Sequence, residues 1–155
     1  MPLKKYKPTS PGRRGASVLV AATAGVQKLE RSLLRVRREH AGRTHGKISV
    51  RHQGGGERRH YRLIDFSEPV LERAGRVIGL QYDPNRSALI ALLSYPTGEK
   101  AYTLAVKDLA VGDIVEVSRT RAVEIKPGNR LPLKFIPAGM LVCNLELFPR
   151  QGTKV

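Results

Sequence analysis

From residue 60 onward, short apolar runs alternate with clusters of turn-forming residues along the chain. The first run, "HYRLIDF" at 60–66, sets Tyr61 and Leu63 against Arg62 and Ile64. Alternation with a period of two predicts a β-strand with one face buried. Further strands are predicted at "RVIGLQYD" (76–83), "ALIALLSY" (88–95), "KAYTLAV" (100–106), "DIVEVS" (113–118) and "MLVCNLEL" (140–147).

Turn signals separate these strands, namely "DPNRS", "PTGE", "AVGD" and "KPGN". Short strands joined by frequent turns predict an all-β fold, a small antiparallel barrel. The stretch "LAVKDLAVGD" at 104–113 leaves room for one helical turn between the fourth and fifth strands. This layout fits the five-stranded oligonucleotide/oligosaccharide-binding (OB) fold, although periodicity alone leaves other small barrels open.

The segment before the strands has a helical rather than an alternating pattern. Apolar side chains recur at Val26, Leu29, Leu33 and either Leu34 or Val36, and arginines are displaced from that stripe. This spacing predicts a short helix over 26–39 that docks on a neighbouring element. A helix on a membrane surface is the alternative, but no aromatic residue is present to anchor it.

Charge divides the chain into two parts. The whole sequence has 28 Lys and Arg against 13 Asp and Glu, a net charge of +15, and 12 of these net charges lie in residues 1–66. A field of this sign attracts polyanions, above all nucleic acid. We therefore expect a basic, largely extended N-terminal arm (1–59), a barrel with following strands (60–148) and a short tail (149–155).

Several classes of protein are disfavoured by composition. No apolar run approaches the roughly 20 residues needed to span a bilayer. The single Cys143 excludes an intramolecular disulfide and a cysteine-cluster zinc site, and its strand-like surroundings predict a buried, inert thiol. The N-terminus is basic and free of acidic residues up to Glu30, which loosely fits a mitochondrial presequence.

Three consecutive glycines in "VRHQGGGERRHYRLIDF" (50–66) lie within the densest positive charge. A phosphate-binding loop would lead into a helix and carry a lysine–hydroxyl pair, but these glycines lead into a strand. The four histidines lack the spacing and the acidic support of a metal site, and no Ser/His/Asp grouping is evident. Glycines flanked by arginines instead predict a backbone that lies close to phosphate. A flexible, solvated loop remains the alternative.

The identity of the nucleic acid follows from what the sequence lacks. Specific DNA binders present a recognition helix, and single-strand binders stack bases on exposed aromatic rings. This chain has no Trp and only 5% aromatic residues, and its tyrosines at 82, 95 and 102 lie in strand-like runs. This combination favours a folded RNA, bound through its shape and its backbone.

The chain resembles the universal large-subunit ribosomal protein two, the L-two family, over essentially its whole length. The matching stretches are "KPTSPGRR" (7–14), "HGKISVRHQGGGERRHYRLIDF" (45–66), "YDPNRSALIAL" (82–92), "GEKAYTLA" (98–105), "IKPGNRLPLKFIPAG" (125–139) and "VCNLEL" (142–147). The resemblance implies an OB barrel over about 60–130 and an arm embedded in large-subunit ribosomal RNA. It implies a non-enzymatic scaffold, without cofactor or metal, that supports subunit association and the peptidyl transferase region.

The sequence departs from the family pattern at three places. Glu57 stands where the family usually has histidine or another non-acidic residue, and the helix-like 26–39 segment replaces a more irregular arm. The family continues into a second, SH3-like barrel, whereas this sequence reads "FPRQGTKV" after the first. We therefore expect a split protein or a fragment, with a second chain that carries the SH3-like half. Split forms favour a mitochondrial over a bacterial ribosome.

The partners expected from this interpretation are large-subunit ribosomal RNA, the second chain and neighbouring ribosomal proteins, without a membrane. A free-standing RNA-binding OB module outside the ribosome is the alternative. The apolar residues Met140, Leu141, Leu145 and Phe148 are expected to form the surface that the second barrel covers. Asp83, at a strand end, is expected to cap a turn or to pair with an arginine. Candidate RNA-binding residues are Arg13, Arg14, Arg43, Lys47, Arg51, His52, Gly54, Gly55, Gly56, Arg58, Arg59, Arg62, Arg86 and Lys126.

Overall fold

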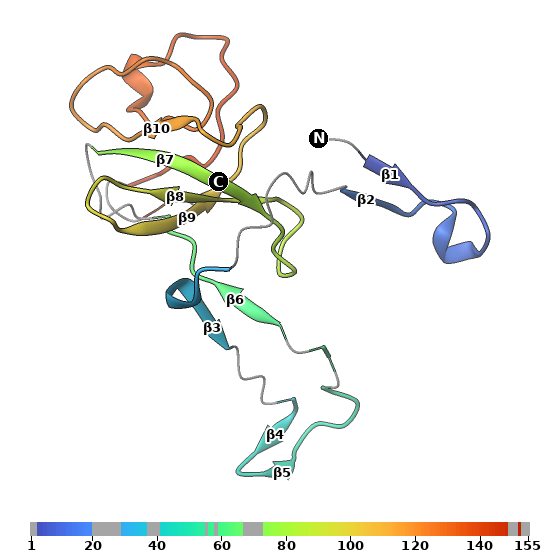
Figure 1. Cartoon of the computed structure of the whole chain (residues 1–155). Helices are drawn as coiled ribbons and strands as arrows, with labels where there is room; N and C mark the ends of the chain where they lie inside the picture. Colours follow the sequence, from blue (N-terminus) through green and yellow to red (C-terminus); the bar gives the residue numbers. More distant parts are fainter. Residues whose placement is uncertain are drawn as a thin grey trace.

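A computed structural model describes residues 3–19, 29–36, 41–54, 56–57, 59–66, 73–148 and 152 of the chain. Within these ranges the fold is all-β, as predicted (Figure 1). The helical elements are three single turns of 3-10 helix: η1 (Pro11–Arg13), η2 (Arg31–Leu33) and η3 (Leu133–Phe135).

A four-stranded antiparallel sheet forms the body of the protein. Its strands β7 (Ala74–Gln81), β8 (Ile90–Ser94), β9 (Lys100–Leu104) and β10 (Ile114–Glu116) are arranged in the order β10-β7-β8-β9. All four lie within or next to stretches that the sequence pattern predicts as strands. Parallel bridges extend the sheet at both edges, from Ile64 to Tyr102 and from Val117 to Arg130. The arrangement is consistent with a small OB-like barrel, and its hydrogen bonding does not close within the described residues.

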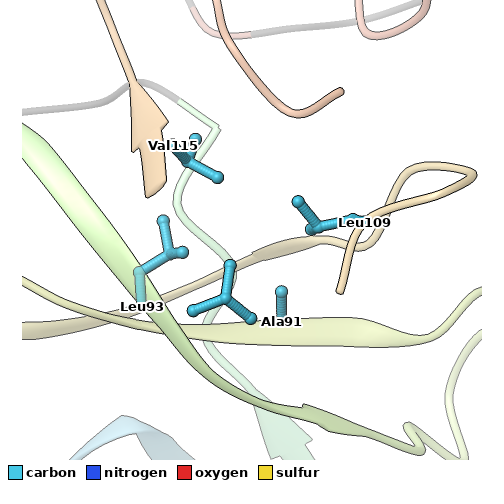
Figure 2. Packing of buried hydrophobic residues seen from close by; sticks show 5 residues of the cluster. Ala91, Leu93, Leu109 and Val115 are labelled. Carbon is cyan, nitrogen blue, oxygen red and sulfur yellow. The ribbon is translucent and has the colours of Figure 1, made fainter. Parts of the chain in front are cut away.

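The hydrophobic core lies on both faces of β8, because β8 is a central strand and its side chains alternate between the two faces. Ala91 and Leu93 pack with Val77, Leu109 and Val115 on one face, as Figure 2 shows. Ile90 and Leu92 pack with Tyr102 on the other face. This second cluster is the one that receives the N-terminal arm.

Three short antiparallel pairs form the arm. β1 (Leu3–Lys5) pairs with β2 (Ser17–Leu19) in a separate hairpin. β3 (Leu34–Val36) pairs with β6 (His60–Arg62), and between them β4 (Arg43–Thr44) pairs with β5 (Lys47–Ile48). We call the described residues 41–54, 56, 57 and 59 the finger, since Figure 1 shows this segment projecting away from the sheet.

The predicted helix over 26–39 is wrong for residues 29–36, and its remaining residues lie outside the described ranges. One 3-10 turn leads directly into β3, because the backbone of Leu34–Val36 pairs with β6 instead of with itself. Leu33 nevertheless packs against the cluster around Tyr102. This segment therefore does dock on a neighbouring element, through a 3-10 turn that contains Leu33 and the strand that follows it rather than through an α-helix.

Two further predictions fail for reasons of backbone conformation. The stretch 104–113 contains hydrogen-bonded turns instead of a helical turn, and Asp108 (φ 66°) and Gly112 (φ 101°) both take conformations that end a helix. Residues 140–147 form no strand, since Asn144 (φ 55°) interrupts extended backbone and no described strand pairs with this segment. Cys143 is accordingly exposed and not buried.

Candidate nucleic-acid interface

The finger is a folded loop rather than a loose tether. His45 (φ 50°) and Gly46 (φ 77°) connect β4 to β5, and positive φ at both central residues is the signature of a type I′ hairpin turn. The base of the loop closes where the backbone N–H groups of Ser49 and Val50 donate to the Gly42 carbonyl, at 2.8 and 3.0 Å. The hairpin thus has a defined shape before any partner arrives.

Positive side chains cover this loop. Arg43 and Lys47 lie on the two paired strands, and Arg51 and His52 follow them; all four are exposed. None of the four forms an ion pair with a described residue. Exposed guanidinium and ammonium groups without a carboxylate partner are available to phosphate oxygens.

The triple glycine has two different explanations along its length. Gly54 has φ +102°, and a Cβ atom built there would lie 2.8 Å from the Cβ of Ala41, so the fold of the finger itself requires glycine. A Cβ atom on Gly56 would meet nothing within 4 Å. Gly55, like Arg58, lies outside the described residues. Of the two glycines of this run that the structure describes, Gly56 is therefore the one whose requirement a partner could impose.

The N-terminal hairpin presents a second basic group. Arg13 ends η1 and Arg14 follows it; both are exposed. The guanidinium carbon of Arg13 lies 5.3 Å from the centroid of the Tyr6 ring, and Lys4 Nζ lies 5.9 Å from the same centroid. These cation–π contacts order the two cations on one ring, which sequence inspection did not anticipate.

The turn at 83–86 gathers predicted site residues from two distant parts of the chain. Asp83 is fully buried, and its carboxylate accepts from Arg86 Nε at 2.6 Å and from the Asn85 backbone N–H at 3.0 Å. Arg62 Nη1 lies 3.8 Å from Asp83 Oδ1. The sequence-based expectation that Asp83 serves as a turn cap or an arginine partner is thereby confirmed in both senses.

Two hydrogen bonds join this turn to the end of the finger and to the start of β6. Arg59 Nη1 donates to the Pro84 carbonyl at 3.1 Å, and Asn85 Nδ2 donates to the His60 carbonyl at 3.0 Å. Arg59 is exposed, whereas Arg62 is only 6% exposed and donates through Nη1 to the His60 carbonyl at 2.7 Å. The predicted arginines in this junction therefore differ: Arg59 faces solvent, Arg86 is half-buried and Arg62 belongs to the interior.

The ionisation of Asp83 reflects this environment. Burial alone would raise the pKa of its carboxyl group, but hydrogen bonds from the Asn85 backbone, from Arg86 and from the Asn85 side chain, together with the charge of Arg86, outweigh burial and lower the pKa. The carboxylate is thus charged at neutral pH, and it offsets the positive charges packed around it.

Tyr102 joins the arm to the sheet. It is 1% exposed, donates a hydrogen bond to Gln81 Oε1 at 2.9 Å and accepts one from the Glu30 backbone N–H at 3.3 Å. The Glu30 side chain forms an ion pair with Lys100 at 2.7 Å, and this contact lowers the pKa of Glu30. Sequence reasoning placed Tyr102 in the core by default, but it could not show that a residue 72 positions away bonds to its hydroxyl.

Lys126 is not brought into this group by any contact. It lies on the loop after β10, where it forms a 2.7 Å ion pair with Glu124 that raises the pKa of Lys126. Among the described residues no cluster of His, Cys, Asp and Glu could hold a metal ion. No helix in the described part of the chain is long and apolar enough to cross a membrane.

Comparison with known families agrees with this geometry. Residues 30–117, more than half of the chain, match the family model described as "Ribosomal Proteins L2, RNA binding N-terminal domain". The match begins at the segment that docks on Tyr102, includes the finger and ends with the bridge after β10. This family consists of structural proteins of the ribosome, not of enzymes. The chain belongs to the ribosomal protein L2 family.

Proposed function

We propose that this chain is a structural constituent of the large ribosomal subunit that binds and stabilises large-subunit ribosomal RNA. The observation that carries the proposal is the finger, whose exposed cations Arg43, Lys47 and Arg51 have no ion-pair partner in the described residues. A folded hairpin with outward charges loses little conformational freedom when it binds, so that its phosphate contacts come at a lower entropic cost.

The remaining candidate residues take different parts in this proposal. His52, Arg13 and Arg14 are exposed and contact RNA directly, and Gly56 lets the backbone approach it closely. Arg62 is buried, and its part is to hold the finger on the sheet. Gly55 and Arg58 are included in the proposed interface because of their positions in the sequence.

The test is the dependence of RNA binding on salt. For duplex-like RNA each neutralised phosphate adds about 0.9 to the slope of log K against log salt. Replacement of Arg43, Lys47 and Arg51 by Gln should lower the slope by up to about 2.7. The matched control replaces Arg76, Lys107 and Arg121, which are exposed on the body, and changes the net charge equally. An equal decrease of the slope in the two variants would refute a finger-centred interface.

Co-sedimentation separates the ribosomal role from the alternative of a free-standing RNA-binding module. The protein should remain with large subunits through a high-salt sucrose cushion, since interdigitated RNA contacts dissociate slowly. A protein that leaves the subunits at modest salt and binds other RNAs equally well would fit the alternative. If the protein is formed by two chains, as proposed below, a mitochondrial ribosome is favoured over a bacterial one, and organelle fractionation tests this placement.

We further propose that a second chain with an SH3-like barrel covers residues 140–148, and that the assembled protein supports subunit association and the peptidyl transferase region. Met140, Leu141 and Phe148 are 50%, 102% and 61% exposed, an apolar surface of the kind that interfaces use, while Leu145 is half-buried. Cys143 is the chain's single cysteine and lies exposed within this surface. A photo-crosslinker attached to Cys143 in large subunits should capture a protein; capture of RNA alone would contradict the second chain.

A further inference from the structure

The junction at 83–86 contains a feature that simple electrostatics does not explain. A negative charge beside Arg59, Arg62 and Arg86 opposes the binding of an RNA phosphate, yet Asp83 is fully buried at their centre. A chain that needed only positive charge here would bind RNA better without this carboxylate. The contacts of Asp83 show what it does instead.

Each contact of Asp83 fixes a group that belongs to the interface. Its Oδ2 atom accepts from Arg86 Nε at 2.6 Å, which leaves both terminal nitrogens of Arg86 without a partner among the described residues. Its Oδ1 atom accepts from the backbone and the side chain of Asn85, at 3.0 and 3.1 Å. The turn so fixed then holds the end of the finger through Pro84 and Asn85.

Arg62 provides an independent indication that the charge of Asp83 is required. The Arg62 side chain is 8% exposed, and its Nε atom is buried without a hydrogen-bond partner in the described residues. A buried guanidinium needs a compensating charge, and Asp83 is the carboxylate that forms an ion pair with it. Loss of the carboxylate would therefore release β6, from which the finger extends.

We propose that Asp83 is a positioning residue of the RNA interface: it aims Arg86 outward and holds the finger through Arg62 and the 83–86 turn, so that removal of its negative charge weakens RNA binding. This proposal rests on the proposed function, since it concerns the same RNA interface. Net charge alone predicts tighter RNA binding when the loss of Asp83 raises the charge of the protein by one. The proposal predicts the opposite, weaker RNA binding.

The experiment compares Asp83→Asn with Asp108→Asn in filter binding to large-subunit ribosomal RNA over a salt series. Asp108 is exposed at φ 66°, a conformation that Asn accepts readily, so this control makes the same charge change without a structural loss. We expect Asp83→Asn to bind about tenfold more weakly, with a slope lower by about 0.9 for each phosphate that the variant no longer neutralises. Asp108→Asn should bind as wild type does or slightly more tightly.

A merely structural role would leave the salt slope unchanged at temperatures where the variant is folded, as near-ultraviolet circular dichroism can verify. In an Arg86→Ala background, Asp83→Asn should lower the slope by less than it does alone, because part of its effect acts through Arg86. Wild-type affinity and slope for Asp83→Asn, or tighter binding, would overturn the proposal.

Should Asp83→Asn fail to fold, Arg86→Lys tests the same arrangement without a change of net charge. The Arg86 side chain is 21% exposed. Arginine can bind Asp83 through Nε and a phosphate through its two terminal nitrogens, whereas lysine has a single nitrogen and cannot form both contacts in this way. Arg86→Lys should then lose nearly as much affinity as Arg86→Ala, and wild-type binding would overturn the proposal. If the wild type itself binds ribosomal RNA no better than an unrelated RNA duplex, the proposed function fails rather than the role of Asp83.

Discussion

Replacement of Tyr102 by Phe removes the two hydrogen bonds of its hydroxyl group, one of which docks the arm on the sheet. The ring stays in place, so its packing against Ile90 and Leu92 is kept, while the hydroxyl group is removed. That group donates to Gln81 at 2.9 Å in the interior and accepts from the Glu30 backbone N–H at 3.3 Å. The substitution therefore removes two hydrogen bonds without creating a large cavity.

The expected cost follows from the environments of the two bonds. A typical intramolecular hydrogen bond contributes about 0.5–1.5 kcal/mol to the free energy of unfolding. The hydrogen bond to Gln81 is buried, so its loss should cost a free energy near the upper limit of this range. The Glu30 N–H can form a hydrogen bond with water instead, so its loss should cost a free energy near the lower limit. We expect Tyr102→Phe to lower the free energy of unfolding by about 1–2 kcal/mol.

Urea denaturation measures this cost as a lower midpoint with an unchanged m-value, since the surface exposed on unfolding stays the same. Tyr95→Phe is the matched control, because Tyr95 is half-buried and its hydroxyl forms no hydrogen bond with a described residue. Hydrogen exchange should also show faster exchange of the Glu30 amide in Tyr102→Phe. A free energy of unfolding equal to that of Tyr95→Phe, with Glu30 still protected, would refute the docking role of the hydroxyl group.

Three further outcomes are expected. Gly54→Ala should speed amide exchange within the finger, because alanine at φ +102° costs about 1–2 kcal/mol and its Cβ would meet Ala41. Gly56→Ala is the control and should leave amide exchange in the isolated protein unchanged. Because the pKa of Asp83 is lowered in the folded state, its contribution to stability is complete above the unfolded carboxyl pKa of about 3.9 and is lost as the pH falls through the folded pKa. The free energy of unfolding, measured as the pH is lowered, should therefore decrease less in Asp83→Asn than in wild type. Leu141→Ser should leave the free energy of unfolding unchanged, since Leu141 is 102% exposed, yet weaken association with the chain proposed to cover it; destabilisation of the isolated protein would show that this surface packs internally.

Some features follow from short-range patterns, and the sequence alone predicts them. Short apolar runs bounded by turn residues locate β7 to β10. Side chains alternate in β7, which is half-buried, whereas β8 is apolar except at its last residue because both of its faces are buried. The charge difference between the two parts of the chain predicts that the first part binds a polyanion, since residues 1–66 carry a net charge of +12. The pairing of Asp83 with Arg86 is likewise local, because three positions separate the two residues.

Other features depend on contacts between distant residues, and only the tertiary structure decided them. Residues 29–36 have helical spacing, but β6 offered their backbone a strand partner and Tyr102 offered Leu33 a packing site. Apolar residues at 140–147 have the pattern of a strand, yet Asn144 turns the backbone and Cys143 remains in solvent. Among the predicted arginines, Arg62 is buried and Arg59 is exposed although only two residues separate them. The reason is that the carboxylate paired with Arg62 comes from Asp83, far along the chain.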